Sequence, residues 1–133
     1  MKLQIKWSKP VELEDASSEN QIYTAPIEKL PDAPGIYIFG HQWGSGLLEA
    51  LYVGRAARIK GRIKRHFNNL RLMQHVRNAK NGKRIVLAGR LVAKPGQRVD
   101  KCLKIIERGC IRHFLMEQLG LRYSLMRARE LLK

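Results

Sequence analysis

Gly35-Ile36-Tyr37-Ile38-Phe39-Gly40 is the stretch of the sequence that decides the predicted fold. Its β-branched and aromatic residues stand between glycines, a composition typical of a β-strand. The turn residues Trp43-Gly44-Ser45-Gly46 follow, and residues 47–53 form a second apolar run that ends at Gly54. Two strands joined by such a turn form a hairpin. Residues 35–54 therefore predict a hairpin, which is rather long because of the segment that carries Trp43.

After the hairpin, the apolar residues are spaced as in a helix and no longer as in a strand. Ile59, Ile63 and Phe67 step by four residues, which predicts a helix over residues 57–68. The later elements are predicted as a short helix over 71–80, a strand over 84–93, a long helix over 101–119 capped by Asp100, and a final helix over 122–132. The resulting order predicts an α/β chain of the α+β type, with a small, mostly antiparallel three-stranded sheet flanked by helices.

The segment before the hairpin is less regular. Leu3, Ile5 and Trp7 alternate with polar residues, which indicates one short strand. The prolines that follow disfavour helix. We therefore expect an N-terminal arm over residues 1–34 and a single domain over residues 35–133.

The charge of the chain favours an anionic polymer as its partner. The 133 residues include 26 Lys and Arg against 11 Asp and Glu, a net charge of +15. The basic residues are spread over several predicted elements and do not line one amphipathic helix, which disfavours a membrane partner. The chain has no apolar run of membrane-spanning length and no N-terminal signal pattern, so we expect a cytoplasmic protein.

Cysteine and histidine give little sign of a metal cluster. The two cysteines, Cys102 and Cys110, fall in an apolar helical pattern and are expected to be buried free thiols. The four histidines have no metal-binding spacing with them. His41 is expected in a loop.

A basic row on the first predicted helix is the first candidate site. Arg58, Arg62 and His66 are four residues apart and therefore share a helix face. Guanidinium groups on a rigid element suit phosphate, because each offers a planar fork of donors. A solvated basic face is the alternative, and it is the more common one for a stretch taken alone.

Glu107 is the second candidate. It stands between Leu103 and Ile111 on the apolar face of the long predicted helix. A carboxylate there must be paired, protonated or bound to metal. A metal ligand and a partly buried ion pair with an arginine are equally consistent with this position.

In sequence order, these residues resemble the GIY-YIG nuclease family. Gly35-Ile36-Tyr37 matches the first signature, and Tyr52-Val53-Gly54 matches the second with Val in place of the middle Ile. Arg62 stands eight residues after this second signature, and His66 follows four residues later. The pair Glu107-Arg108, with Ile111 four residues beyond the Glu, matches the metal-binding helix. The resemblance covers about residues 35–125.

The resemblance implies a DNA endonuclease that hydrolyses phosphodiester bonds with one divalent metal ion, magnesium or alternatively manganese. It gives Glu107 the metal and Arg62 the scissile phosphate. Tyr37 would be the base for the attacking water, with His66 and local cations favouring its phenolate. Tyr52 would position water or phosphate. We expect these five residues to converge on one concave surface.

The resemblance also implies a DNA-binding surface, to which four basic residues are assigned: Arg55, Arg58, Lys60 and Arg65. Members of the family act in DNA repair, restriction and recombination, and a protein partner or a homodimer is open for this chain. The family usually has an Asn about fifteen residues after the Glu. Here either Ser124 or Arg122 replaces it, or the position is dispensable.

Two other functions remain open. A catalytically inactive nucleic-acid-binding module on the same fold is favoured by the missing Asn, but it would have no reason to keep the five central residues. An RNA-binding protein without nuclease ancestry would need aromatic stacking platforms. The aromatic fraction of 7% gives little sign of them.

Overall fold

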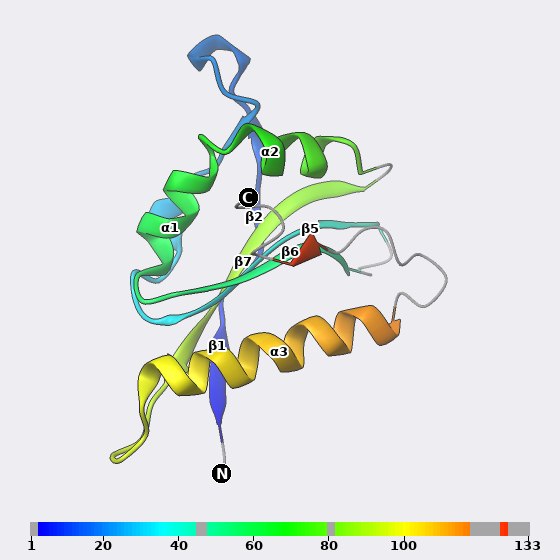
Figure 1. Cartoon of the computed structure of the whole chain (residues 1–133). Helices are drawn as coiled ribbons and strands as arrows, with labels where there is room; N and C mark the ends of the chain where they lie inside the picture. The colour runs from blue at the N-terminus through cyan, green and yellow to red at the C-terminus, as the bar shows by residue number, and fades with distance from the viewer. Residues whose placement is uncertain (1–2, 45–47, 80–81, 118–125, 128–133) are drawn as a thin grey trace.

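The computed structural model describes residues 3–44, 48–79, 82–117 and 126–127. Within them the chain is a mixed α+β fold built on one main sheet (Figure 1). Its centre consists of the three predicted strands. β5 (Gly35–Gln42) pairs antiparallel with β6 (Leu48–Ala56) on one side and with β7 (Lys83–Val92) on the other. The predicted class and the central hairpin are confirmed.

The predicted number of three strands is too small, because short strands extend this sheet to six. β1 (Gln4–Trp7) and β2 (Val11–Glu12) pair antiparallel with β7, and β8 (Met126–Arg127) pairs parallel with β6. The final helix predicted over residues 122–132 is therefore wrong at Met126 and Arg127, and its other residues lie outside those described. β1 confirms the short strand predicted from Leu3, Ile5 and Trp7, whereas the two-residue strands β2 and β8 are too short to show alternation. They exist because the longer strands offer unpaired edges.

The N-terminal segment is packed against the body of the protein. Besides β1 and β2 it contains a small sheet of β3 (Glu14–Asp15) and β4 (Tyr23–Thr24), and two single-turn helices, η1 (Ser17–Glu19) and η2 (Ile27–Lys29). Val11, Leu13 and Leu30 are buried in the same apolar cluster as Tyr37. The segment predicted as an arm with one strand thus holds four short strands and part of the core.

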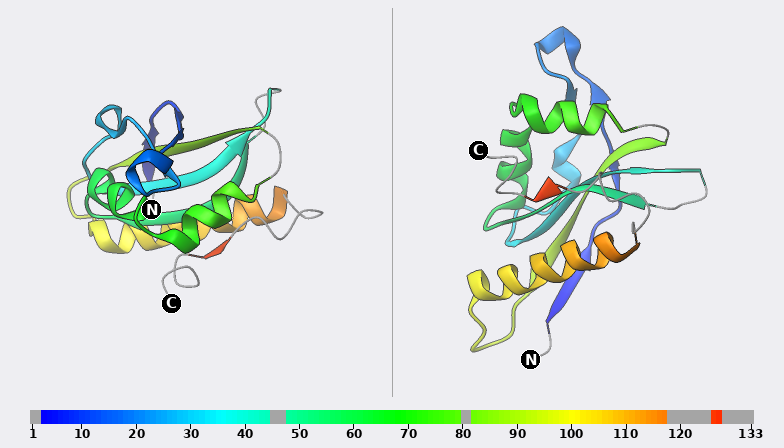
Figure 2. Two further views of the ribbon diagram at one scale, coloured as in Figure 1. Left: turned by 90° about the horizontal axis from the view of Figure 1, so that it is seen from above. Right: turned by 45° about the vertical axis from the view of Figure 1, so that its right-hand side comes forward.

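Helices cover both faces of the sheet. α1 (Ile59–His66) and α2 (Leu70–Arg77) lie on one face, and α3 (Val99–Glu117) lies on the other, as Figure 1 and the turned view on the right of Figure 2 show. These are the three helices predicted before residue 120. α3 begins one residue before Asp100, which lies in its first turn and is not its cap. Among the described residues, no helix is long and apolar enough to cross a bilayer.

Alternation along β5 divides the core into two layers. Tyr37 and Phe39 face α1 and α2, whereas Ile36 and Ile38 face α3. Cys102 is buried in the α3 layer and Cys110 is half-buried beside it, both as free thiols. Because side chains alternate across a strand, the same rule decides on which side of the sheet each candidate residue lies.

Candidate active site

A buried tyrosine–histidine pair forms the centre of the candidate site. Tyr37 extends from β5, and His66 stands in the last turn of α1. The Tyr37 Oη and His66 Nε2 atoms are 2.6 Å apart. Ile59 and Ile63 are fully buried and fix α1 on the sheet. The four-residue apolar spacing that predicted the helix therefore also brings His66 to Tyr37.

Tyr52, from the neighbouring strand β6, completes an aromatic cluster. Its ring centroid lies 5.9 Å from that of Tyr37 and 5.3 Å from that of His66. A hydrogen bond between the two tyrosine hydroxyls contributes to the pKa of each. The two tyrosines of the signature tripeptides and the histidine are thus in direct contact.

Gly54 makes room for this arrangement. It is the cross-strand partner of Tyr37. A Cβ atom at Gly54 would collide with Oη of Tyr37 and lie 2.5 Å from its Cζ. The phenol ring of Tyr37 therefore lies across the backbone of β6. A residue of the central strand β5 reaches the outer edge of the sheet by this route.

The protonation states differ in part from the expectation. Burial raises the pKa of Tyr37, neighbouring Tyr52 raises it further, and Arg62 only partly offsets both effects. Burial raises the pKa of Tyr52 as well. The expected stabilisation of the Tyr37 phenolate by nearby cations is therefore wrong for the free protein, because desolvation of the charged form outweighs their attraction. Both tyrosines are neutral phenols at neutral pH.

His66 is neutral too. Burial, followed by the charges of Arg62 and Arg65, lowers the pKa of His66 to about 4. At pH 7 its ring therefore carries one proton, so Nε2 either accepts a hydrogen bond from Tyr37 or donates one to it. Burial first, and the neighbouring arginines second, thus keep the imidazole of His66 neutral beside an uncharged phenol.

The pKa of His66 predicts a pH-dependent stability. In the unfolded chain His66 titrates near 6.5, and in the folded protein near 4. Between these values the unfolded state binds the extra proton, so the free energy of unfolding falls as the pH falls from 6.5 to 4. The loss is at most about 3 kcal/mol and levels off below pH 4. Urea unfolding at a series of pH values measures it.

The matched variant is His66→Asn, which removes the titrating group. We expect its stability to change less with pH over the same interval than that of the wild-type protein. Identical pH dependence in both proteins would show that His66 is not held neutral by its surroundings.

Arg62 lies on the flank of α1 that faces the cluster. Its charge lowers the pKa values of Tyr37, Tyr52 and His66 alike. Arg65, three residues further along the helix, shares this flank.

The other two basic residues assigned to DNA on this segment differ in their surroundings. Arg58, at the N-cap of α1, donates to Asp32 at 3.0 Å. Lys60 stands two residues before Arg62, a spacing that turns its side chain to the opposite flank of the helix. Lys60 therefore points away from the cluster, and its assignment to a DNA-binding surface stays a prediction.

Glu107 belongs to the other layer of the protein. It lies on α3, and it is buried against Arg55, which points from β6 toward the α3 side. Arg55 Nη1 donates to Glu107 Oε1 over 2.5 Å. The second oxygen, Oε2, is buried and has no hydrogen-bond partner among the described residues. The ion pair with an arginine, one of the two alternatives left open by the sequence, is thus present, and it uses one of the two carboxylate oxygens.

Glu107 nevertheless acts on the aromatic cluster. Its negative charge raises the pKa of both Tyr37 and Tyr52. In the described part of the chain β8 pairs with Tyr52 and Val53, and Arg55, the partner of Glu107, follows two residues later on β6. Tyr37, Tyr52 and His66 are thus in contact on the α1 side of the sheet, with Arg62 beside them. Glu107 lies on α3, on the other side of the sheet, so the five residues do not share one layer as expected, and only the charge of Glu107 acts on the two tyrosines.

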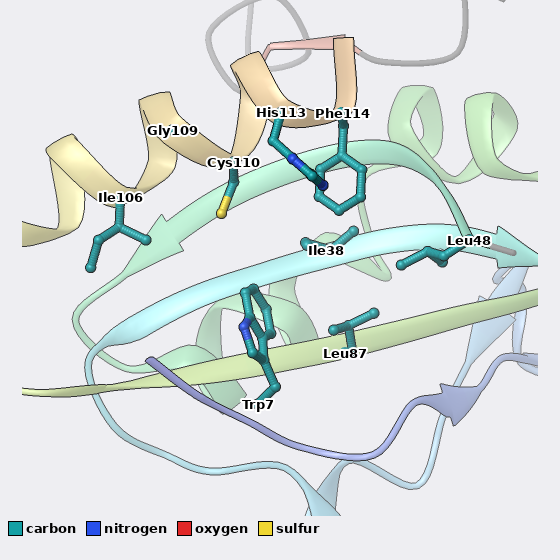
Figure 3. Close-up of a pocket in the computed structure, with 9 residues that line it drawn as sticks. All are labelled: Trp7, Ile38, Leu48, Leu87, Ile106, Gly109, Cys110, His113 and Phe114. Atoms are coloured by element: carbon teal, nitrogen blue, oxygen red, sulfur yellow. The ribbon is translucent and has the colours of Figure 1, made fainter. Parts of the chain in front are cut away.

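A pocket of about 550 Å³ lies elsewhere. Figure 3 shows it between α3 and the sheet, with Trp7 of β1 opposite Phe114. Its lining is mostly apolar and includes none of the five candidate residues: Trp7, Ile38, Leu48, Leu87, Ile106, Gly109, Cys110, His113 and Phe114. The concave surface expected at the site is thus not this pocket.

The sequence did not identify the partners in two side-chain pairs. Besides Arg55–Glu107, His41 Nε2 lies 2.5 Å from Glu49 Oε1, and both residues are buried. His41 belongs to β5, not to a loop as expected. Its two-residue spacing from Phe39 and Tyr37 could have indicated that the strand extends to His41. The pairing with Glu49 depends on the β5–β6 register, which shifts after Phe39.

The donor set for a metal ion consists of one carboxylate. No group of three or more His, Cys, Asp or Glu residues comes together within the described ranges. Magnesium keeps several of its waters and is often held by one or two carboxylates. The partnerless buried Oε2 of Glu107 fits such a ligand, because a buried anionic oxygen without a donor otherwise has an uncompensated desolvation energy. Residues 122 and 124, where a family Asn would be replaced, lie outside the described ranges.

Comparison with known proteins does not indicate a function for this site. No protein-family model, no curated protein and no solved structure matches this chain. The site is therefore interpreted from its own residues.

Proposed function

We propose that this protein is a metal-dependent DNA endonuclease that hydrolyses phosphodiester bonds near Tyr52 and Arg55, toward the end of β6. The observation that carries the proposal is the contact between Tyr37 and His66, with Arg62 and Glu107 acting on the same hydroxyl. A neutral proton-transfer pair, a phosphate-binding cation and a metal-binding carboxylate are the groups that this hydrolysis needs. The resemblance to GIY-YIG nucleases supports the same assignment.

Tyr37 and His66 form the proton pathway. The attacking water gives a proton to Tyr37 Oη while Tyr37 passes its own proton to His66 Nε2, so a free phenolate, which burial disfavours, never forms. The water oxygen bonds to phosphorus, the bond from phosphorus to the leaving sugar oxygen breaks, and that oxygen takes a proton from solvent. A phosphate bound by Arg62 offsets the positive charges that hold the pKa of His66 low, so His66 becomes a better proton acceptor when substrate is present.

Arg62 and Glu107 supply the charges. Arg62 would donate to the scissile phosphate and stabilise the negative charge that develops on it. Glu107 would hold one divalent ion, magnesium or manganese, through its partnerless oxygen. When bound, such an ion polarises a phosphate oxygen and stabilises the leaving oxyanion.

Basic residues on both sides of the site favour a polyanionic substrate. Arg62 and Arg65 flank it on α1. On α3, Lys104, Arg108 and Arg112 are exposed and follow one another at steps of four, which makes one stripe. Glu107 stands next to Arg108, so this stripe borders the carboxylate. A DNA duplex lying across the end of β6 would meet both helices.

The experiment that tests the proposal is incubation of the protein with labelled duplex, flap and branched DNAs, with magnesium and with EDTA. Cleavage of at least one DNA with magnesium and none with EDTA is the expected result. DNA binding without cleavage of any substrate would favour the second candidate, a non-cutting binding module. Binding and cleavage confined to matched RNA substrates would exclude DNA as the substrate.

A second prediction concerns salt. Each phosphate contact contributes about −0.9 to the slope of log affinity against log salt for duplex DNA. Changing Lys104, Arg108 and Arg112 together to Gln should weaken duplex binding and make this slope shallower by about 2 to 3. Fluorescence anisotropy of a labelled duplex at several salt concentrations measures both quantities.

The matched control removes the same charge from the opposite edge of the sheet. It changes Lys6, Lys9 and Lys94 to Gln, three exposed residues on or beside β1 and β7. We expect this variant to keep nearly the wild-type slope. Equal losses in the two triple variants would mean that overall charge, and not this surface, determines binding.

A further inference from the structure

The ion pair between Arg55 and Glu107 is asymmetric. The Glu107 side chain is 10% exposed, whereas that of Arg55 is 41% exposed. Arg55 Nη1 contacts Oε1, 2.5 Å away, while Oε2 is buried with no hydrogen-bond partner in the described part of the protein. The carboxylate is therefore fixed in the protein, and its cationic partner reaches it from the solvent side.

This difference in exposure indicates which of the two side chains, Arg55 or Glu107, can move away and break the ion pair. Glu107 comes from the buried face of α3, and little of its side chain is exposed. Arg55 follows Gly54 on β6, beyond the two residues that pair with β8. Its guanidinium is already partly exposed, so it can turn into water without losing hydration. Arg58, the next arginine along the chain, already has Asp32 as its partner.

Arg55 and a metal ion would compete for Glu107. Both are cations, and both need the same carboxylate as their anionic partner. A guanidinium also binds a phosphate in the same forked geometry as a carboxylate. A DNA phosphate near the end of β6 would therefore offer Arg55 an alternative anion.

We propose that Arg55 blocks metal binding at Glu107 until DNA binds. In the free protein Arg55 is ion-paired with Glu107. When DNA binds, Arg55 pairs with a phosphate instead, and the Glu107 carboxylate becomes available to the divalent ion. This inference rests on the proposed nuclease function. DNA and metal then promote the binding of each other, because each favours the state in which Arg55 has left Glu107.

The first arm of the test measures metal binding without DNA. Mn²⁺, which is visible by electron paramagnetic resonance, is titrated into the full-length wild-type protein, Arg55→Gln and Arg55→Lys. Arg55→Gln should bind Mn²⁺ about tenfold more tightly than wild type, which is 1.4 kcal/mol. Arg55→Lys keeps a cation and should stay near wild type. Arg58→Gln removes an equal charge from the Asp32 pair and should also stay near wild type.

The second arm follows Arg55 itself in EDTA, so that neither metal nor cleavage interferes. The ¹⁵N resonance of Arg55 Nε is assigned by its loss in Arg55→Gln, and its position in the ion pair is established by its shift in Glu107→Gln. Addition of duplex DNA should move the wild-type resonance away from the ion-paired position. Thermal melting of every variant, with and without Mn²⁺, keeps a change of fold apart from a change of binding.

Three results would contradict this role of Arg55. The first is an unchanged Mn²⁺ affinity in a folded Arg55→Gln protein, and the second is an equal increase of Mn²⁺ affinity in Arg58→Gln. The third is an Arg55 resonance that stays at its ion-paired position when DNA binds. Failure of the nuclease function gives a different pattern. DNA would then still release Arg55 and Arg55→Gln would still bind Mn²⁺ more tightly, but no DNA would be cleaved by the wild-type protein with magnesium.

Discussion

Glu107→Ala is expected to abolish DNA cleavage while leaving DNA binding unchanged or slightly stronger. The carboxylate would anchor the metal ion that stabilises the transition state, an effect worth several kcal/mol. A loss of about 4 kcal/mol lowers the rate about a thousandfold. Without metal, Glu107 would repel a nearby phosphate and would hold Arg55 away from it, so its removal should not weaken binding. Arg62→Ala should differ and weaken both cleavage and DNA binding, because in the proposed mechanism Arg62 would contact the phosphate in the ground state as well.

If the ion pair between Arg55 and Glu107 only stabilises the fold, Glu107→Ala should lower stability and not cleavage alone. Breaking a buried ion pair by removing one partner costs about 3 to 5 kcal/mol of stability. Here the cost should be smaller, because Arg55 is 41% exposed and can turn to water. Single-turnover cleavage and thermal melting of the same preparation therefore separate the two roles.

Glu107→Gln is the matched variant. It keeps the shape of the side chain and an oxygen that can accept from Arg55, but it loses the charge that a metal ion needs. We expect a folded, DNA-binding and inactive protein. A folded Glu107→Ala or Glu107→Gln protein that cuts at the wild-type rate would exclude Glu107 as the metal ligand.

Gly54→Ala should have the second large effect. The new Cβ would collide with Oη of Tyr37, whose ring is buried and held by His66. The ring must move, so the contact between Tyr37 and His66 is lost. Overpacking of this kind costs about 1 to 3 kcal/mol. Cleavage should fall about as far as in Tyr37→Phe, the variant that removes only the hydroxyl.

Gly61→Ala is the control for this change. Gly61 is exposed in the middle of α1, and an added Cβ meets nothing within 4 Å. Alanine there should stabilise the helix by about 0.5 to 1 kcal/mol and leave cleavage unaffected. Melting curves and cleavage rates of the three variants test the argument. A Gly54→Ala protein with wild-type activity would show that the Tyr37–His66 contact is dispensable.

The sequence by itself determined the elements that have a long, regular period. Residues 35–54 indicated the hairpin, the four-residue steps of Ile59, Ile63 and Phe67 indicated α1, and the apolar face around Glu107 indicated α3. These patterns are readable because each element buries one continuous face, and burial of that face supplies most of its stability. The positions of Tyr37 and Tyr52 on paired strands, and of Arg62 and His66 on one helix, follow from the same local periods.

Only the tertiary structure decided which of these residues meet. β2 and β8 are strands because edges of longer strands are available to them, which no local pattern records. The pKa of His66 falls, and that of Tyr37 rises, because packing removes water from both. The partner of Glu107 is Arg55, 52 residues earlier in the chain, since α3 packs against β6. Sequence fixes the period and chemistry of each element, whereas desolvation and pairing between distant residues depend on how the elements pack.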